Sequence, residues 1–248
     1  MKYLILGVIQ GLTEFLPISS SGHLLIAQKI MRFNGGYGLG LIIFAHLGTL
    51  LVLFSYFFKE IKELLRSIEL LKYTFFATLI TGIEGLFFKK YFEFLFDFYE
   101  VVKFTLIVNG FFILLASFLC RDFKERSSFR LKEALGFGIV QGLSVIPGIS
   151  RSGITISYLL LKKFDIESAF KLSFLTGIPA ILGAFILEAR EIIFASPYRL
   201  GNYFFCLIIS FISGFFALII LKRFLYRAKF YYFGYYCILV GIILFFIK

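Results

Sequence analysis

Two short segments of the chain combine polar side chains with helix-breaking residues, and both lie within apolar sequence. The first, residues 10–23, reads QGLTEFLPISSSGH, and the second, residues 147–153, reads PGISRSG. They contain the ionisable side chains Glu14, His23 and Arg151. An ionisable group inside a membrane costs about 2.5–3.5 kcal/mol on insertion scales, so such groups are candidates for function.

Each segment is expected to end one helix and to begin another. Pro17 and Pro147 break the chain, and the serines that follow are good caps for the next helix. Free backbone N–H groups at a helix N-terminus, with hydroxyl groups and a guanidinium beside them, form a binding site for phosphate. The predicted phosphate-binding residues are Ser19, Ser21, Gly22, Ser150, Arg151, Ser152 and Gly153.

A carboxylate in a phosphate site needs a second task, because alone it would repel the ligand. Glu14 shares one helix face with Gln10, four residues earlier, and it can hold a divalent cation or act as an acid or base. Ser20 and His23 supply a nucleophile or a proton carrier. The predicted catalytic residues for phosphoryl transfer are Glu14, Ser20, His23 and Arg151, and the nucleophile is left open between Ser20, His23 and water.

Each of these residues also has a structural interpretation. Tips rich in serine and glycine permit close helix packing. Glu14 can pair with Arg151 for structure alone, and His23 can be a hydrogen-bonded core histidine. Together these explain two matched tips poorly, so we favour function. For His46, a lone polar residue in an apolar run, packing between helices is the preferred interpretation over catalysis.

The composition is that of a membrane protein. Of the 248 residues, 60% are hydrophobic and 17% are charged, and the mean hydropathy is +0.92. Soluble domains have about 45–50% apolar and about 25% charged residues. This excludes an ordinary soluble enzyme, a disordered chain and a disulfide scaffold. The net charge of +11 is explained by Lys and Arg beside anionic lipid headgroups, and no nucleic-acid partner is expected.

The pattern of apolar runs predicts an all-α, polytopic protein of the cell membrane. About six spanning helices are expected, at 40–58, 73–88, 101–119, 166–188, 203–221 and 233–247. Residues 1–31 and 134–161 are apolar but broken, and they are predicted to form two re-entrant helical hairpins. Basic residues gather in the linkers 59–72, 121–132 and 222–229. The positive-inside rule places these linkers in the cytoplasm and both termini outside.

The two broken segments also resemble each other. An ungapped alignment of residues 9–22 with 140–153 matches about seven of fourteen positions. Three predicted crossings separate the copies, so the second is inverted relative to the first. We therefore expect a single domain, 1–248, of two inverted repeats, about 1–119 and 134–248. Their re-entrant tips should meet inside the membrane and form a polar site there.

At these motifs the chain resembles the undecaprenyl-diphosphate phosphatases, also called bacitracin-resistance proteins. The resemblance covers nearly the whole chain and includes Leu172–Ala180. It implies a membrane enzyme that removes the terminal phosphate of undecaprenyl diphosphate, which recycles the lipid carrier for peptidoglycan and other cell-wall glycans. It also implies a divalent metal, Mg²⁺ or Ca²⁺. The family's Glu/Gln-x-x-x-Glu pair, Ser, His and Arg fall here on Gln10 and Glu14, Ser20, His23 and Arg151. The resemblance thus makes Glu14 the main anionic metal ligand and Gln10 a weaker one.

The alternative function is a transporter or flippase for a polyprenyl phosphate or another anion, because carriers also hold anions between paired re-entrant hairpins. Glu14 and His23 favour the enzyme, since a pure anion carrier has less need of them. The expected partners are the polyprenyl diphosphate substrate and membrane lipids, and a homodimer is left open. The face to which the site opens is also left open.

Overall fold

The computed structural model describes residues 2–31, 38–92, 99–119, 129–189 and 200–246, and every regular element in these ranges is helical. The helices are α1 (Lys2–Phe15), α2 (Ser20–Ile30), α3 (Gly38–Tyr56), α4 (Phe58–Arg66), α5 (Ile68–Tyr91), α6 (Tyr99–Leu119), α7 (Leu131–Gly142), the 3₁₀ turn η2 (Leu143–Val145), α8 (Arg151–Leu161), α9 (Ile166–Ala189), α10 (Leu200–Tyr226) and α11 (Tyr231–Phe246). The all-α prediction is confirmed.

Four of these helices are long and apolar enough to cross a membrane, and they are α5, α6, α9 and α10. A fifth candidate is α3 continued into α4, with a bend of 72° between the two helices. The sixth predicted span corresponds to α11, whose 16 residues make it a shorter apolar helix. The chain is therefore a multi-pass membrane protein, as its composition indicates.

The outer faces of the long helices carry large apolar side chains that no other part of the described chain covers. Ile83, Phe104, Phe216 and Leu239 are each more than half exposed, at 58% to 60%. A soluble protein rarely exposes so much continuous apolar surface. In a bilayer the same side chains contact lipid tails, so this surface is what a membrane-spanning fold requires.

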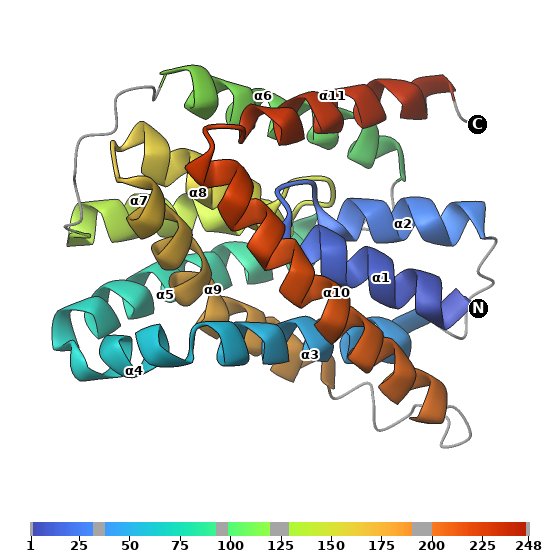
Figure 1. Ribbon diagram of the computed structural model, residues 1–248, viewed down its shortest axis with the longest axis horizontal. Helices are drawn as coiled ribbons and strands as arrows, with labels where there is room; N and C mark the ends of the chain where they lie inside the picture. The colour runs from blue at the N-terminus through green and yellow to red at the C-terminus, as the bar shows by residue number, and fades with distance from the viewer. Residues whose placement is uncertain (1, 32–37, 93–98, 120–128, 190–199, 247–248) are drawn as a thin grey trace.

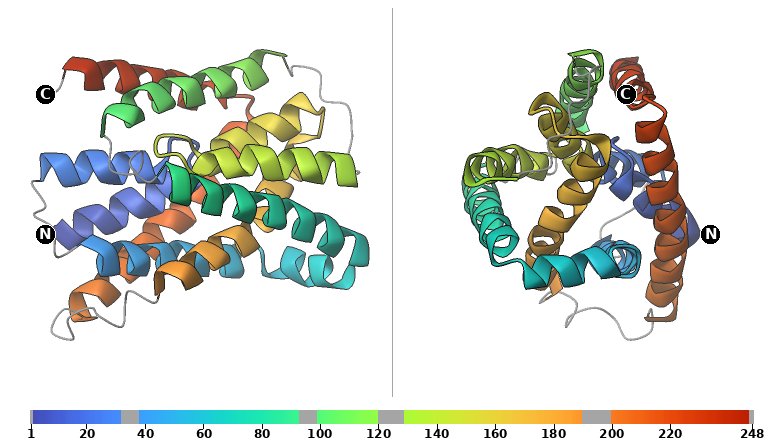
Figure 2. Two further views of the ribbon diagram at one scale, coloured as in Figure 1. Left: turned by 180° about the vertical axis from the view of Figure 1, so that it is seen from behind. Right: turned by 60° about the vertical axis from the view of Figure 1, so that its left-hand side comes forward.

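The two broken segments enter the molecule from opposite ends. In Figure 1, α1 runs from one end to the centre and α2 returns to the same end, whereas α7 and α8 do the same from the other end. The two breaks meet near the centre in both further orientations of Figure 2. The start of α1 and the end of α11 lie at the same end of the molecule. The exact limits of the two repeats stay a prediction.

Each broken segment packs against one long helix, α1 on α10 and α7 on α5, while α6 lies beside α11. The crossing of α1 and α10 is close enough to need a glycine. A Cβ atom at Gly11 would lie 2.5 Å from the carbonyl oxygen of Ser210 and 2.8 Å from the nitrogen of Gly214. This close contact fixes the position of the α1 end, and therefore of the side chains that follow Gly11.

Candidate active site

The first break brings Ser19 to the start of α2. Helix α1 ends at Phe15, two residues before Pro17, which cannot continue it. Ser19 has φ 71°, a left-handed conformation that is uncommon outside glycine and is often found at functional sites. Its hydroxyl oxygen accepts a hydrogen bond from the backbone N–H of Gly22 at 3.3 Å. Ser19 is therefore the cap of α2, and it is one of the serines after Pro17 from which a cap was expected.

The second break is built in a similar way. Ser150 caps α8, and its hydroxyl oxygen accepts from the backbone N–H of Gly153 at 3.2 Å. Gly148 has φ +94°, and a Cβ atom there would lie 2.9 Å from Cβ of Thr105. Only glycine fits both the conformation and the space. The turn therefore places Arg151 at the first position of α8.

The two breaks are in direct contact. The backbone N–H of Gly148 donates to the hydroxyl oxygen of Ser19 at 3.1 Å, and the hydroxyl of Ser152 donates to the carbonyl oxygen of Phe15 at 3.0 Å. Ser19 and Ser152 are buried, at 2% and 0% exposure. Contact between the tips is what the sequence analysis expects.

The predicted phosphate-binding serines are already engaged in hydrogen bonds within the two breaks. Ser19 and Ser150 are helix caps, the hydroxyls of Ser19 and Ser21 are 3.3 Å apart, and those of Ser150 and Ser152 are 3.2 Å apart. The N–H groups of Gly22 and Gly153 are the capped groups. Among the predicted phosphate-binding groups, Arg151 is the one that reaches the cluster around Glu14.

Glu14 is the centre of a buried polar cluster drawn from both breaks. Its Oε2 accepts from the hydroxyl of Ser20 at 2.7 Å and from Nε2 of Gln10 at 3.0 Å. Its Oε1 lies 3.5 Å from Nη2 of Arg151. The side chains of Glu14 and Arg151 are only 11% and 13% exposed. The structure therefore brings together four predicted site residues, and it directs the proton of Ser20 toward a carboxylate.

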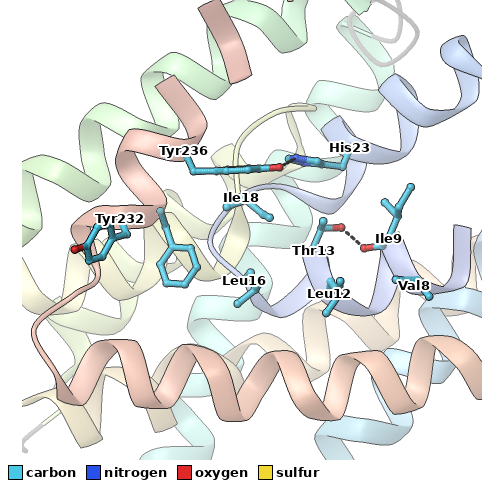
Figure 3. Close-up of a pocket in the computed structure, with 10 residues that line it drawn as sticks. Val8, Ile9, Leu12, Thr13, Leu16, Ile18, His23, Tyr232 and Tyr236 are labelled. Carbon is cyan, nitrogen blue, oxygen red and sulfur yellow. Dashed lines mark hydrogen bonds between the residues drawn. The ribbon is translucent and has the colours of Figure 1, made fainter. Parts of the chain in front are cut away.

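His23 points away from this cluster. Its Nδ1 donates to the carbonyl oxygen of Ser19 at 2.8 Å, and its Nε2 lies 2.9 Å from the hydroxyl of Tyr236. Because a carbonyl only accepts, Nδ1 carries a proton, and in the neutral ring Nε2 accepts from Tyr236. Figure 3 shows the two rings in contact on the α11 side of the break. Both nitrogens of this predicted catalytic residue are thus engaged elsewhere.

His46 lies beside Glu14, although the sequence favoured a packing role for this histidine. Its Nε2 is 3.9 Å from Oε2 of Glu14, and its Nδ1 donates to the carbonyl oxygen of Ile42 at 3.0 Å. The bond to Ile42 orients the ring so that Nε2 faces the carboxylate. The reason is that α3 packs against both α1 and α10, which turns His46 toward the site.

Asn109, which the sequence motifs did not single out, joins the two breaks. Its Nδ2 donates to the carbonyl oxygen of Pro17 at 3.1 Å, and its Oδ1 accepts from the backbone N–H of Ser150 at 3.0 Å. The side chain is buried at 1% exposure in the middle of α6. The signal was present, since a polar residue at the centre of an apolar span is costly and marks a functional position.

Replacing Asn109 by Leu should weaken the contact between the breaks. The change leaves the buried backbone N–H of Ser150 without a partner, at about 1–3 kcal/mol, and it leaves the carbonyl oxygen of Pro17 with only the thiol of Cys237 at 3.5 Å. We expect a lower melting temperature in detergent and a lower hydrolysis rate. Val108→Leu, on the exposed face of the same helix, is the matched control. An Asn109→Leu protein with normal stability and normal turnover would contradict this role.

The cluster also fits a divalent cation. Gln10 is fully buried, and its Oε1 has no hydrogen-bond partner among the described residues. A carboxylate and an amide oxygen are ligands that Mg²⁺ and Ca²⁺ accept, with water and substrate phosphates as the others. Within the described ranges, no group of three or more His, Cys, Asp or Glu side chains lies close enough together to hold a metal ion. A cation bound by Glu14 and Gln10 would therefore need the substrate phosphates as further ligands.

Comparison with known proteins identifies the family. The family model "Bacitracin resistance protein BacA" matches residues 3–243. The chain belongs to the BacA family. An undecaprenyl-diphosphatase of Halothermothrix orenii is 36% identical over 98% of this chain and 96% of its own length. Proteins of the same name from Thermosipho africanus and Methanococcus vannielii are 37% and 35% identical, over 100% and 99% of each chain.

Membership of the BacA family agrees with the resemblance found in the motifs. The matched region contains both breaks and all the residues of the Glu14 cluster. The two motifs of the family are distant in the sequence of this chain, and they are in contact in its structure.

Proposed function

We propose that this chain is an undecaprenyl-diphosphatase that hydrolyses undecaprenyl diphosphate to undecaprenyl phosphate and inorganic phosphate. The family and the names of the relatives support this activity. The structural observation that carries it is the meeting of Glu14, Ser20 and Arg151 at one buried point. A base, a hydroxyl nucleophile and a cation are the groups that phosphoryl transfer uses. By recycling the lipid carrier, the enzyme serves cell-wall synthesis and bacitracin resistance.

Ser20 is the nucleophile that the geometry favours. Its hydroxyl already donates to Glu14 at 2.7 Å, within the range for proton transfer to a general base. In the first step Oγ of Ser20 attacks the terminal phosphorus, and its proton passes to Glu14. The bond from this phosphorus to the bridging oxygen breaks, and undecaprenyl phosphate leaves with that oxygen.

Water completes the reaction in a second step. It attacks the phosphorus of the phosphoserine, the bond to Oγ of Ser20 breaks, and Glu14 returns the proton to Ser20. Inorganic phosphate leaves with the oxygen of the water and with both of its protons, as H₂PO₄⁻. Direct attack by water, with Glu14 as base, is the alternative that the same cluster allows, and a phosphoserine at position 20 distinguishes the two.

Arg151 is placed to hold the phosphate that is transferred. Its Nη2 lies beside Glu14, while its Nη1 is buried without a partner among the described residues. A Cβ atom at Gly177 would collide with Nη1, so α9 leaves room for the guanidinium at this point. A free donor of this kind suits a phosphate oxygen, because Arg makes paired hydrogen bonds to phosphate.

A divalent cation, Mg²⁺ or Ca²⁺, would be held by Glu14 and Oε1 of Gln10. When bound, it would neutralise negative charge on the diphosphate. His46 extends the same edge of the site, with its Nε2 3.9 Å from Oε2 of Glu14. Gln10 and Ser20 both donate to the carboxylate of Glu14, so they orient this carboxylate whether or not the ion is present.

We also place both termini outside the cell membrane, on the positive-inside rule. The common end of α1 and α11 in Figure 1 supports their lying on one side. Of the basic linkers, Arg121, Lys124 and Arg126 lie outside the described residues. A homodimer stays a prediction.

Phosphate release by the purified protein separates this function from that of a carrier. In detergent there are no compartments, so a transporter has nothing to move and releases no phosphate. We expect steady release of inorganic phosphate from undecaprenyl diphosphate. A protein that binds the lipid but releases no phosphate, with or without Mg²⁺ or Ca²⁺, would refute the enzyme and favour the flippase.

A further inference from the structure

A groove lies between α1 and α11, on the side of the first break to which His23 points. We call it the α1–α11 groove, and its volume is about 440 Å³. Figure 3 shows its lining side chains around a common space, with α10 running beneath. Its walls include Val8, Leu12, Leu16, Ile18, Tyr232 and Tyr236.

The groove is apolar, and the polar side chains of Thr13, His23 and Tyr236 in its lining are already hydrogen-bonded. The hydroxyl of Thr13 donates to the carbonyl oxygen of Ile9 at 2.6 Å, and His23 and Tyr236 bond to each other. No charged group belongs to the lining residues described for it. Tyr232 and Tyr236 are 48% and 40% exposed, so the groove opens at the side of the molecule, where lipid tails lie. Its chemistry suits a hydrocarbon chain.

The groove and the Glu14 cluster lie on opposite faces of α1. Val8, Leu12 and Leu16 are spaced by four residues and share the groove face, whereas Gln10 and Glu14 are offset by two. The two sites approach each other at the break. Ile18 lines the groove, and Ser20, two residues later, donates to Glu14. The break between α1 and α2 therefore contributes residues to both sites.

We propose that the α1–α11 groove binds the first isoprene units of the polyprenyl chain of the substrate. The His23–Tyr236 pair then lies at the boundary between the diphosphate and the hydrocarbon. This inference rests on the proposed function, which supplies a head that is held by Glu14, Ser20 and Arg151. Three features support this occupant over a charged ligand or a protein segment: the apolar lining, the lateral opening and the break that the groove shares with the catalytic cluster.

The groove should affect selectivity for chain length more than the rate of chemistry. The chain comes from lipid and not from water, so its burial gains little hydrophobic free energy. What the groove adds is van der Waals contact and a fixed direction for the chain, which place the head at Ser20. Blocking the groove should therefore harm a long substrate and spare a short one.

Leu12→Trp tests this, because the larger side chain fills the groove from α1. KM and kcat are measured with undecaprenyl diphosphate and with isopentenyl diphosphate, whose single isoprene unit can occupy only the end of the groove nearest the break. We expect KM for the long substrate to rise about 5-fold or more, as for overpacking that costs ~1 kcal/mol or more. For isopentenyl diphosphate, kcat/KM should stay within about 2-fold. Phe111→Trp, on the lipid-facing side of α6, is the control and should change neither.

Two results would overturn the groove while leaving the phosphatase intact. One is a Leu12→Trp protein whose KM and kcat match those of the unaltered protein with both substrates. The other is an equal loss of kcat/KM with both substrates. Failure of the wild-type protein to hydrolyse either diphosphate would instead refute the proposed function. If Leu12→Trp does not fold, the unaltered protein gives the answer. A diazirine in the first isoprene units of the diphosphate should label α1 or α11 on irradiation, and labelling confined to other helices would refute the inference.

Discussion

Glu14→Gln should lower the rate of phosphate release from undecaprenyl diphosphate by about 100-fold or more. Glutamine keeps the size of the side chain and can still accept from Ser20, but it cannot take the proton from that hydroxyl. Loss of a positioned general base costs 10²–10⁴-fold in typical enzymes, so about 100-fold is the lower bound. The measurement is kcat in detergent with saturating substrate.

The matched control is Glu100→Gln. Glu100 is a carboxylate in α6 whose side chain is 60% exposed and pairs with Lys103. It should leave kcat unchanged, because it does not belong to the cluster. A Glu14→Gln protein that inserts, elutes as the unaltered protein does and keeps half of its activity would show that Glu14 is not the base.

Arg151→Ala should reduce kcat/KM by about 1,000-fold. An arginine that stabilises the charge of a transferring phosphoryl group contributes about 10³–10⁵-fold in other phosphoryl-transfer enzymes. In addition, Glu14 would remain buried without its cationic neighbour. Arg151→Lys should recover only part of the loss, because an ammonium group lacks the planar pair of donors.

Arg223→Ala is the control for the loss of a guanidinium. Arg223 is an exposed residue near the end of α10, away from both breaks. Rates of this variant should match those of the unaltered protein. If Arg151→Lys were fully active, or if Arg151→Ala changed stability but not kcat/KM, its role would be structural.

The local features of the site could be predicted from the sequence. Pro17 and Gly148 fix where the helices break, and Ser19 and Ser150 are caps because their neighbours expose free N–H groups. An unpaired charge inside a membrane costs free energy, and this predicts that the side chains of Glu14 and Arg151 lie close together. These features follow from short stretches of chain, so one sequence is enough to show them.

The features that were missed depend on how distant helices pack. His23 turns to Tyr236, 213 residues later in the chain, because α11 lies beside the first break. His46 faces Glu14 because of the rotation of α3 against α1 and α10. Asn109 reaches both breaks from α6, and the apolar sequence around it gave no indication of the direction of its side chain. The rotation of a helix that is apolar on all sides cannot be derived from its own periodicity.

Glu14 and Arg151, from two distant segments, should act on one phosphate as a unit. The most direct test is a double-mutant cycle with Glu14→Ala, Arg151→Ala and the double variant, each measured as kcat/KM. Residues that act as a unit are strongly non-additive, so the double variant should be about as slow as the slower single variant. Losses that simply multiply in the double variant would show that the two residues work independently and would contradict the account.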